Sequence, residues 1–240
     1  MFRSVDYFRV LPENLRGRDF FVGDIHGHYT VLLQSLNAIG FNPAEDRLIS
    51  VGDLVDRGPE STACIELLEA PWFEACLGNH ERMLLSYYLD DDDSLREVHQ
   101  RSGGIWVEQF TREQLRQWCK LIRSRCPLAL EVKFGSRRIG VTHNDVIGLD
   151  WQVMRKKASA KQVDHCVWSR NRFNTALSHP LLVNAVAHID LVVSGHNPHP
   201  EPVWAGNQIY IDTLWKGGAL TILSAEELFI ALANQPLTPP

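Results

Sequence analysis

The chain has 240 residues, enough for one large domain or two small ones with a well-buried core. Its composition, 45% hydrophobic and 22% charged, excludes a disordered tail protein, a coiled coil and a collagen-like chain. The formal net charge of −5 argues against a surface built to bind nucleic acid or an anionic membrane. This net charge does not exclude a small phosphorylated substrate.

No stretch approaches the roughly 20 apolar residues of a transmembrane helix, and residues 1–21 lack the continuous apolar run of a secretion signal. We therefore expect a cytoplasmic protein. The five cysteines are odd in number and contain no CxxC pair, so we expect neither a disulfide framework nor a thiolate zinc site. We expect them to be buried and reduced.

Five short apolar runs each end at a small residue followed by a side chain that can bind metal. Each run has the length of a strand that is buried on both faces. The runs are residues 20–22, 48–51, 75–77, 139–142 and 191–194. The polar groups that follow them are Asp24 and His26, Asp53, Asn79, His143, and His196.

Helical patterns connect the early strands. Residues 29–39 carry apolar side chains at helical spacing and stop at Gly40, a residue favoured just past a helix end. Further helices are predicted over residues 62–68 and 81–89. Alternation of strand and helix predicts an α/β fold, in which ligands bind beyond the carboxyl ends of the strands. The polar groups therefore lie where a site is expected.

We expect a single domain over residues 1–240, since no internal repeat and no long linker divides the chain. About residues 90–138 are helical by pattern and predict an insertion or cap, in which Thr111 and Gln114 form a capping box. The four aspartates at 90–93 lack the ligand spacing of a calcium loop and predict a solvated loop. Residues 209–211, 220–223 and 228–232 predict closing strands of a second sheet, and residues 236–240 a frayed end.

The residue types at the strand ends indicate a metal centre. Asp24 and His26 lie between Gly23 and Gly27, which permit the backbone to bend around an ion. A mixture of carboxylate, amide and imidazole groups suits manganese, iron(II) or zinc. Six candidate ligands suit two metals that share a carboxylate, at the roughly 3.5–4 Å spacing used for phosphoester displacement.

Three segments resemble the signature motifs of the phosphoprotein phosphatase family of metallophosphoesterases: Gly23-Asp24-Ile25-His26-Gly27, Gly52-Asp53-Leu54-Val55-Asp56-Arg57-Gly58 and Gly78-Asn79-His80-Glu81. The chain is most similar to the bacterial and bacteriophage lambda phosphatase branch, on its short length and on His143-Asn144-Asp145, Trp168-Ser169-Arg170 and Ile211-Asp212-Thr213. The resemblance covers about residues 20–223. It implies a calcineurin-like α/β fold of two packed mixed sheets flanked by helices, with a helical insertion.

The resemblance also implies two divalent metal ions, with manganese expected and iron or zinc as the alternatives. The first ion would be held by Asp24, His26 and Asp53, with Asp53 bridging to the second. The second would be completed by Asn79, His143 and His196.

The remaining motif residues would act on the substrate. Arg57 and Arg170 would clamp the phosphoryl oxygens, with Asn79 beside them. His80, oriented by Asp56, would be the general acid at the leaving oxygen. The implied reaction is in-line attack by a metal-bridging hydroxide, with no phosphoenzyme intermediate. For the other histidines we expect surface or structural roles: His28, His99, His165, His179, His188 and His199.

We therefore expect a serine/threonine protein phosphatase with a phosphoprotein or phosphopeptide substrate, which could extend to phosphotyrosine, and no nucleic-acid or membrane partner. The enzymatic alternative is a dinucleoside tetraphosphate hydrolase, which a pocket for adenine against Trp168 or Trp215 would favour. A non-catalytic phosphate-binding protein is the remote alternative, opposed by the intact ligand set.

The sequence departs from the pattern of this branch in two places. Leu214, Trp215 and Lys216 stand where a small-residue turn is usual, and this affects the shape of one pocket wall. Asn144 replaces a small residue between His143 and Asp145. The sequence alone gives no physical account of Asn144.

Overall fold

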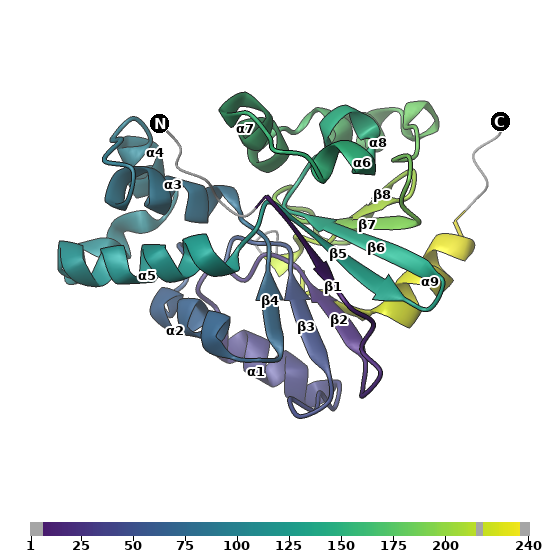
Figure 1. Cartoon of the computed structure of the whole chain (residues 1–240), viewed down its shortest axis with the longest axis horizontal. Helices are drawn as coiled ribbons and strands as arrows, with labels where there is room; N and C mark the ends of the chain where they lie inside the picture. The colour runs from purple at the N-terminus through teal and green to yellow at the C-terminus, as the bar shows by residue number, and fades with distance from the viewer. Residues whose placement is uncertain (1–6, 215–217, 236–240) are drawn as a thin grey trace.

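The computed structural model describes residues 7–214 and 218–235, which form two β-sheets flanked by helices (Figure 1). The smaller sheet contains β2 (Asp19–Val22), β3 (Arg47–Ser50), β4 (Phe73–Ala75) and β10 (Ile222–Ser224), in the order β10-β2-β3-β4. Here β2, β3 and β4 are parallel and β10 is antiparallel to β2.

The larger sheet is also mixed. Its strands are β1 (Phe8–Leu11), β5 (Ala129–Phe134), β6 (Arg137–Thr142), β7 (Leu191–Ser194), β8 (Val203–Ala205) and β9 (Gln208–Tyr210), in the order β1-β5-β6-β7-β9-β8. The pairs β1–β5, β6–β7 and β7–β9 are parallel, and the pairs β5–β6 and β8–β9 are antiparallel. The expected fold class, two mixed sheets flanked by helices, is confirmed.

The two sheets pack face to face, and alternate residues of β2 show how. Phe21 belongs to a buried cluster with Val141 and Val193 of the larger sheet, whereas Phe20 and Val22 belong to a cluster with the helices on the other side. Full burial of each such side chain contributes roughly 1.5–3 kcal/mol. Burial on both faces explains why residues 20–22 of β2 are apolar without alternation.

The helices predicted between the early strands are present. They are α1 (Tyr29–Ala38), α2 (Ser61–Glu66) with the 3-10 helix η1 (Leu67–Glu69), and α3 (Asn79–Tyr88). Gly40 follows α1 with a left-handed φ of 61°, as expected of a residue just past a helix end. The helix α3 begins two residues earlier than predicted, so its first turn contains Asn79 and His80.

The stretch after α3 is helical only to Arg125. It contains α4 (Arg96–Arg101), the 3-10 helix η2 (Gly104–Gln109) and α5 (Arg112–Arg125), and α5 begins with the predicted capping box, in which Thr111 Oγ1 accepts from Gln114 N. The expectation of helix up to residue 138 is wrong, because β5 occupies Ala129–Phe134. Residues Gly135 and Ser136 then form the short connection to β6, in which Gly135 has a φ of 57°.

The C-terminal segment also differs from the sequence prediction. Strands β9 and β10 match two predicted strands, but they do not close one sheet together, because β9 pairs with β7 in the larger sheet and β10 pairs with β2 in the smaller one. The predicted strand at 228–232 lies inside α9 (Ala225–Ala233). Ser224 begins this helix, and its hydroxyl accepts from Glu227 N at 3.2 Å. Residues 236–240, predicted to fray, lie outside the described residues, as do Trp215 and Lys216.

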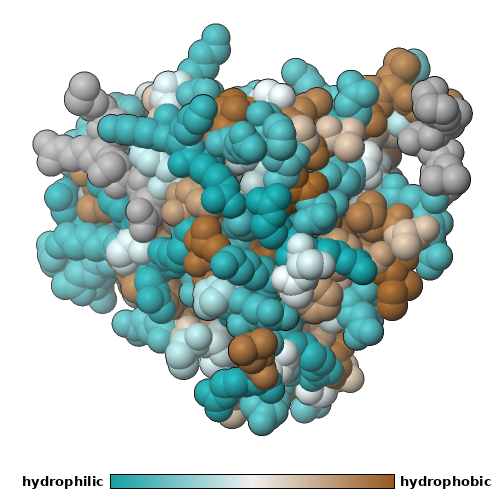
Figure 2. Space-filling model, turned by 45° about the vertical axis from the view of Figure 1, so that its right-hand side comes forward, coloured by the Kyte–Doolittle hydropathy of each residue, from teal (hydrophilic) through white to brown (hydrophobic). Residues whose placement is uncertain are grey.

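Helices cover the face of the larger sheet that is turned away from the smaller sheet (Figure 1). They are α6 (Trp151–Met154), α7 (Ala160–Trp168) and α8 (Asn171–Ser178), with the 3-10 helices η3 (Ile147–Leu149) and η4 (Pro180–Leu182). The face in Figure 2 mixes hydrophilic and hydrophobic side chains. Among the described helices, none is long and apolar enough to span a bilayer. The five cysteines are free and buried, as expected.

Candidate functional site

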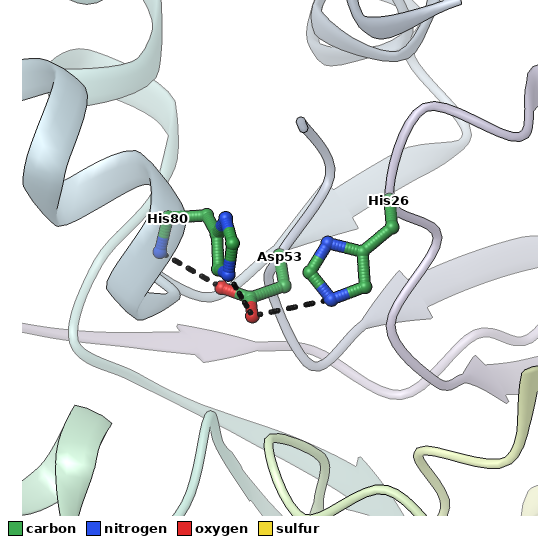
Figure 3. A group of neighbouring side chains, drawn as sticks. All are labelled: His26, Asp53 and His80. Atoms are coloured by element: carbon green, nitrogen blue, oxygen red, sulfur yellow. Dashed lines mark hydrogen bonds and ion pairs between the residues drawn. The ribbon is translucent and has the colours of Figure 1, made fainter. Parts of the chain in front are cut away.

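The strand ends that the sequence singled out meet around Asp53, the residue three positions after β3. Asp53 Oδ2 lies 3.6 Å from His26 Nε2, which follows β2, and 3.8 Å from His80 Nε2, in the first turn of α3 (Figure 3). Asp24 joins this group, with Oδ2 3.9 Å from His26 Nε2. All four side chains are buried.

A second group shares Asp53 and draws on the larger sheet. Asp53 Oδ1 lies 3.4 Å from Nε2 of His143, the residue directly after β6. Asn79 Oδ1 lies 2.9 Å from His143 Nε2 and 2.7 Å from Nδ1 of His196, which follows β7. Asp53 is therefore the carboxylate common to both groups. The structure brings together the six side chains that the sequence proposed as metal ligands.

The histidine rings are held with one nitrogen directed into the site. His26 Nδ1 lies 3.0 Å from the carbonyl of Val55, and His143 Nδ1 lies 2.9 Å from the carbonyl of Val51. A ring nitrogen that donates to a carbonyl leaves the other nitrogen as a lone-pair donor. Burial lowers the pKa of His26 to about 3, so its ring is neutral at physiological pH.

The donor set fits divalent cations. Among the described residues, His196 Nε2 and both carboxylate oxygens of Asp212 are buried and have no hydrogen-bond partner. Burial, followed by the charge of Asp212, raises the pKa of Asp24 well above its usual range. Adjacent buried carboxylates and unpaired nitrogens cost free energy that bound cations would recover.

Glu81 fixes the loop that carries Asp53. Its buried carboxylate accepts from the backbone amides of Asp53 at 2.9 Å, Leu54 at 2.8 Å and Gly78 at 3.0 Å. Two neighbouring motif loops are thereby joined. Glu81 belongs to a signature motif but had no predicted role, although its place three residues into α3 is that of a capping-box acid.

The backbone of the site is strained. His26, Asp53 and His196 have φ values of 45°, 51° and 67°, in the left-handed region that non-glycine residues rarely adopt. Such residues cost of order 1–3 kcal/mol each and cluster at functional sites. Close packing adds a further requirement, because a Cβ on Gly58 would lie 2.4 Å from the carbonyl oxygen of His26.

Asp56 and His80 form the expected pair. His80 Nδ1 donates to Asp56 Oδ2 at 2.6 Å, and both side chains are buried. Although burial opposes the shift, the charge of Asp53 and the bond to Asp56 raise the pKa of His80. Burial likewise opposes the shift at Asp56, whose pKa the bonds from His80 and His99 lower to about 2. The pair can hold a proton on the imidazole that faces the site.

The two predicted phosphate-binding arginines lie differently. Arg57 is partly buried, with Nη1 2.6 Å from His26 Nε2 and Nη2 3.3 Å from His80 Nε2. Arg170 is exposed and is the residue directly before α8. Burial and then the charge of His143 lower the pKa of His196. The charge of Asp53 opposes this shift, and the charge of Arg170 adds to it. Arg57 therefore lies inside the site and Arg170 at its rim.

Two residues that bind Asp56 had no functional role in the sequence prediction. His99, expected to be at the surface or structural, is buried and donates to Asp56 Oδ1 at 3.1 Å. Trp106 donates to the same oxygen at 2.6 Å. Both come from the helical stretch of residues 96–125, which belongs to the insertion expected from the sequence and lies outside the signature motifs.

The profile of the calcineurin-like phosphoesterases matches residues 20–214, and the chain belongs to this family. Membership makes the chain a phosphoesterase that uses divalent metal ions. The recognition made from the three motifs is confirmed.

Curated relatives are similar over most of the chain. Serine/threonine-protein phosphatase 1 of Salmonella typhimurium is 34% identical over 222 residues, which cover 90% of this chain and 95% of the relative. Serine/threonine-protein phosphatase 2 of the same organism is 32% identical, covering 80% and 85%. The symmetrical bis(5'-nucleosyl)-tetraphosphatase of Methylococcus capsulatus is 29% identical, covering 64% and 61%.

Solved structures share the fold at low identity. One that is named provisionally as a diadenosine tetraphosphatase has a TM-score of 0.62 at 21% identity, covering 92% of this chain and 94% of that chain. The cold-active protein-tyrosine phosphatase of a psychrophilic Shewanella has a TM-score of 0.53 at 18% identity, covering 90% and 76%. These likenesses establish the fold alone.

Proposed function

We propose that the chain is a metal-dependent phosphatase that hydrolyses phosphoserine and phosphothreonine in proteins, with two manganese ions as its cofactors. The observation that carries the proposal is the meeting of both ligand groups at Asp53, with the Asp56–His80 pair beside them. The two relatives named serine/threonine-protein phosphatases support the choice of substrate.

The proposed ion sites follow the two groups around Asp53. Asp24, His26 and Asp53 would hold one ion, and Asp53, Asn79, His143 and His196 the other. Divalent ions bound there would neutralise phosphoryl charge and make water a better nucleophile. The mixed nitrogen and oxygen set favours manganese over magnesium or calcium, and activity restored by manganese after metal stripping tests this choice.

The other site residues bind substrate and move a proton. Arg57 and Arg170 would bind the phosphoryl oxygens, because guanidinium matches them in shape and charge. His80 Nε2 faces the site and would deliver its proton to the leaving serine or threonine oxygen. Asp56 would hold the imidazole in place and stabilise its charged form.

A dinucleoside tetraphosphate hydrolase is the second candidate, because the Methylococcus relative carries that name. Trp168 lies close enough to the site to stack on a base, with its ring centroid 6.3 Å from that of His196. Trp215, the other aromatic side chain considered for this role, lies outside the described residues.

Parallel turnover assays decide between the two. The enzyme loaded with manganese is assayed on phosphoserine, phosphothreonine and phosphotyrosine peptides and on diadenosine tetraphosphate, with Asp53→Asn prepared identically to exclude a contaminating phosphatase. We expect the highest kcat/KM on a phosphoserine or phosphothreonine peptide. A higher kcat/KM on diadenosine tetraphosphate would overturn the proposal in favour of the second candidate.

A further inference from the structure

The helical insertion reaches into the site through a short segment, residues 99–106. His99, near the end of α4, and Trp106, in η2, both donate to Oδ1 of Asp56, at 3.1 Å and 2.6 Å. Asp56 is fully buried, and the other oxygen of its carboxylate accepts from His80. The two carboxylate oxygens are therefore bound from different sides, with Oδ1 facing the insertion and Oδ2 facing His80.

The same segment also lies against the backbone at Asp56 and Arg57. These two residues have φ values of 73° and 70°, in the left-handed region that non-glycine residues rarely adopt. Arg57 N donates to the carbonyl of Gly103 at 3.4 Å. A Cβ on Gly103 would lie 2.6 Å from Arg57 N, and a Cβ on Gly104 2.4 Å from His99 Nε2. Glycine at both positions permits this close approach.

Three donors around one buried carboxylate fix its orientation. Charge-assisted hydrogen bonds are short and directional, so an Asp56 held at Oδ1 by two donors has little freedom to rotate Oδ2 away from the imidazole. A carboxylate held only by His80 could turn, and the imidazole would then lose its defined position. The geometry of the imidazole therefore depends on the insertion.

We propose that His99 and Trp106 are positioning residues for the proton transfer by His80, and that they act through Asp56. This inference rests on the proposed role of His80 as the general acid. The insertion would then contribute to catalysis by positioning Asp56, although no signature motif lies in it. The competing explanation is that the two residues only stabilise the fold.

Substrates with different leaving groups separate these explanations. A serine alkoxide leaves slowly without a proton, whereas nitrophenolate leaves readily without one, so loss of acid catalysis falls on the phosphoserine peptide. Trp106→Phe and His99→Phe each remove one donor and keep a ring. We expect kcat on the phosphoserine peptide to fall about tenfold in each, as part of the 10²–10⁴-fold that general acid catalysis supplies. The kcat on nitrophenyl phosphate should fall less than threefold, and the KM of both substrates should stay unchanged.

Two controls make the test specific. His99→Gln retains an N–H donor and should recover most of the loss. Trp118→Phe alters the same aromatic cluster, in which the ring centroids of Trp106 and Trp118 lie 6.2 Å apart, and should leave both activities unchanged. Thermal unfolding of each variant monitors the fold. If His99→Phe does not fold, Trp106→Phe decides the question.

A double-mutant cycle with His80→Asn completes the experiment. Trp106→Phe should cost nothing further in that background, because the group it positions is gone. Two results would overturn the inference. One is an equal loss of kcat on both substrates in Trp106→Phe, and the other is a full additional loss when Trp106→Phe is combined with His80→Asn. The proposed role of His80 as general acid fails separately, if His80→Asn alone loses activity equally on both substrates. A leaving-group bias in His80→Asn but not in Trp106→Phe would reject the inference alone.

Discussion

The side-chain amide of Asn144 donates a hydrogen bond to the backbone carbonyl of Ser169, the residue before Arg170. Asn144 follows His143, is fully buried and accepts from Asn197 Nδ2 at 2.8 Å. Asn197 in turn follows His196. One side chain thus connects the loops of two proposed metal ligands to the loop of a proposed phosphate-binding arginine. These bonds supply the physical account of Asn144 that the sequence alone does not provide.

Asn144→Ala should therefore release the loop that positions Arg170, without removing a proposed metal ligand. The variant leaves the Ser169 carbonyl and the Asn197 amide without this partner. We therefore expect the free energy of unfolding to fall by about 1–3 kcal/mol. Inhibition by inorganic phosphate should weaken about tenfold, with metal content unchanged. In combination with Arg170→Ala the phosphate effect should not add. Unaltered phosphate inhibition in Asn144→Ala would show that the arginine does not depend on this bond.

The meeting of the six proposed metal ligands could be predicted from sequence because their placement follows from strand topology. Each follows a short apolar run, and the carboxyl ends of parallel strands meet at one edge. The contacts of His99 and Trp106 with Asp56 could not be predicted in this way. They span 43 and 50 residues and depend on how the insertion packs, which no local pattern encodes.

Local signals were available where secondary structure was predicted wrongly. Residues 228–232 are apolar like a strand, but the pair Ser224 and Glu227 is a capping box that indicates a helix. In β5, Ala129–Phe134, apolar and polar residues alternate before Gly135, which indicates a strand and a turn. Periodicity over such short windows does not distinguish helix from strand by itself.

A pH-dependent prediction concerns Asp46, away from the site. Its buried carboxylate accepts from Arg18 N at 2.8 Å, Arg18 Nη2 at 2.7 Å and Asn42 N at 2.9 Å. Although burial opposes the shift, the bonds from Arg18 and Asn42 lower the pKa of Asp46 below 3.8. A carboxylate whose pKa is lower in the folded than in the unfolded chain stabilises the fold fully above its unfolded-state pKa. This contribution disappears as the pH falls through the folded-state pKa.

Asp46→Asn should accordingly lower the free energy of unfolding by about 1.5–3 kcal/mol at neutral pH. The difference from the parent protein should shrink below pH 3.8, as measured by urea unfolding at a series of pH values. The exposed Asp93→Asn is the matched control and should show little difference. A gap between Asp46→Asn and the parent that does not change with pH would mean that charge is not the stabilising feature.

Truncation of either proposed phosphate-binding arginine should weaken inhibition by inorganic phosphate and lower kcat/KM together. Charge-assisted contacts of this kind contribute about 1.5–3 kcal/mol, which corresponds to about 10-fold to 150-fold. Arg170→Lys keeps the charge but loses the two-pronged geometry, and should recover only part of the effect. Phosphate inhibition that is the same in Arg170→Ala as in the parent would place Arg170 outside the binding site.

The last prediction separates the two proposed metal sites. Asp53 belongs to both groups, with its oxygens 3.6 Å from His26 Nε2 and 3.4 Å from His143 Nε2. The side-chain oxygen of Asn79 lies within hydrogen-bond distance of His143 and His196, which belong to the second group. After dialysis against manganese, elemental analysis should find two ions per chain in the parent. Asp53→Asn should retain less than one ion, and Asn79→Ala close to one.

Thermal unfolding gives a second, independent measure of the same occupancy. Ligand that binds only the folded chain stabilises it by about 2.7 kcal/mol at 100 times its Kd, so manganese should raise the Tm of the parent clearly and that of Asp53→Asn hardly at all. Replacement of an exposed histidine away from the site, His188→Ala, should leave both readouts as in the parent. Two ions retained by Asp53→Asn, with a parent-like rise in Tm, would contradict the bridging assignment.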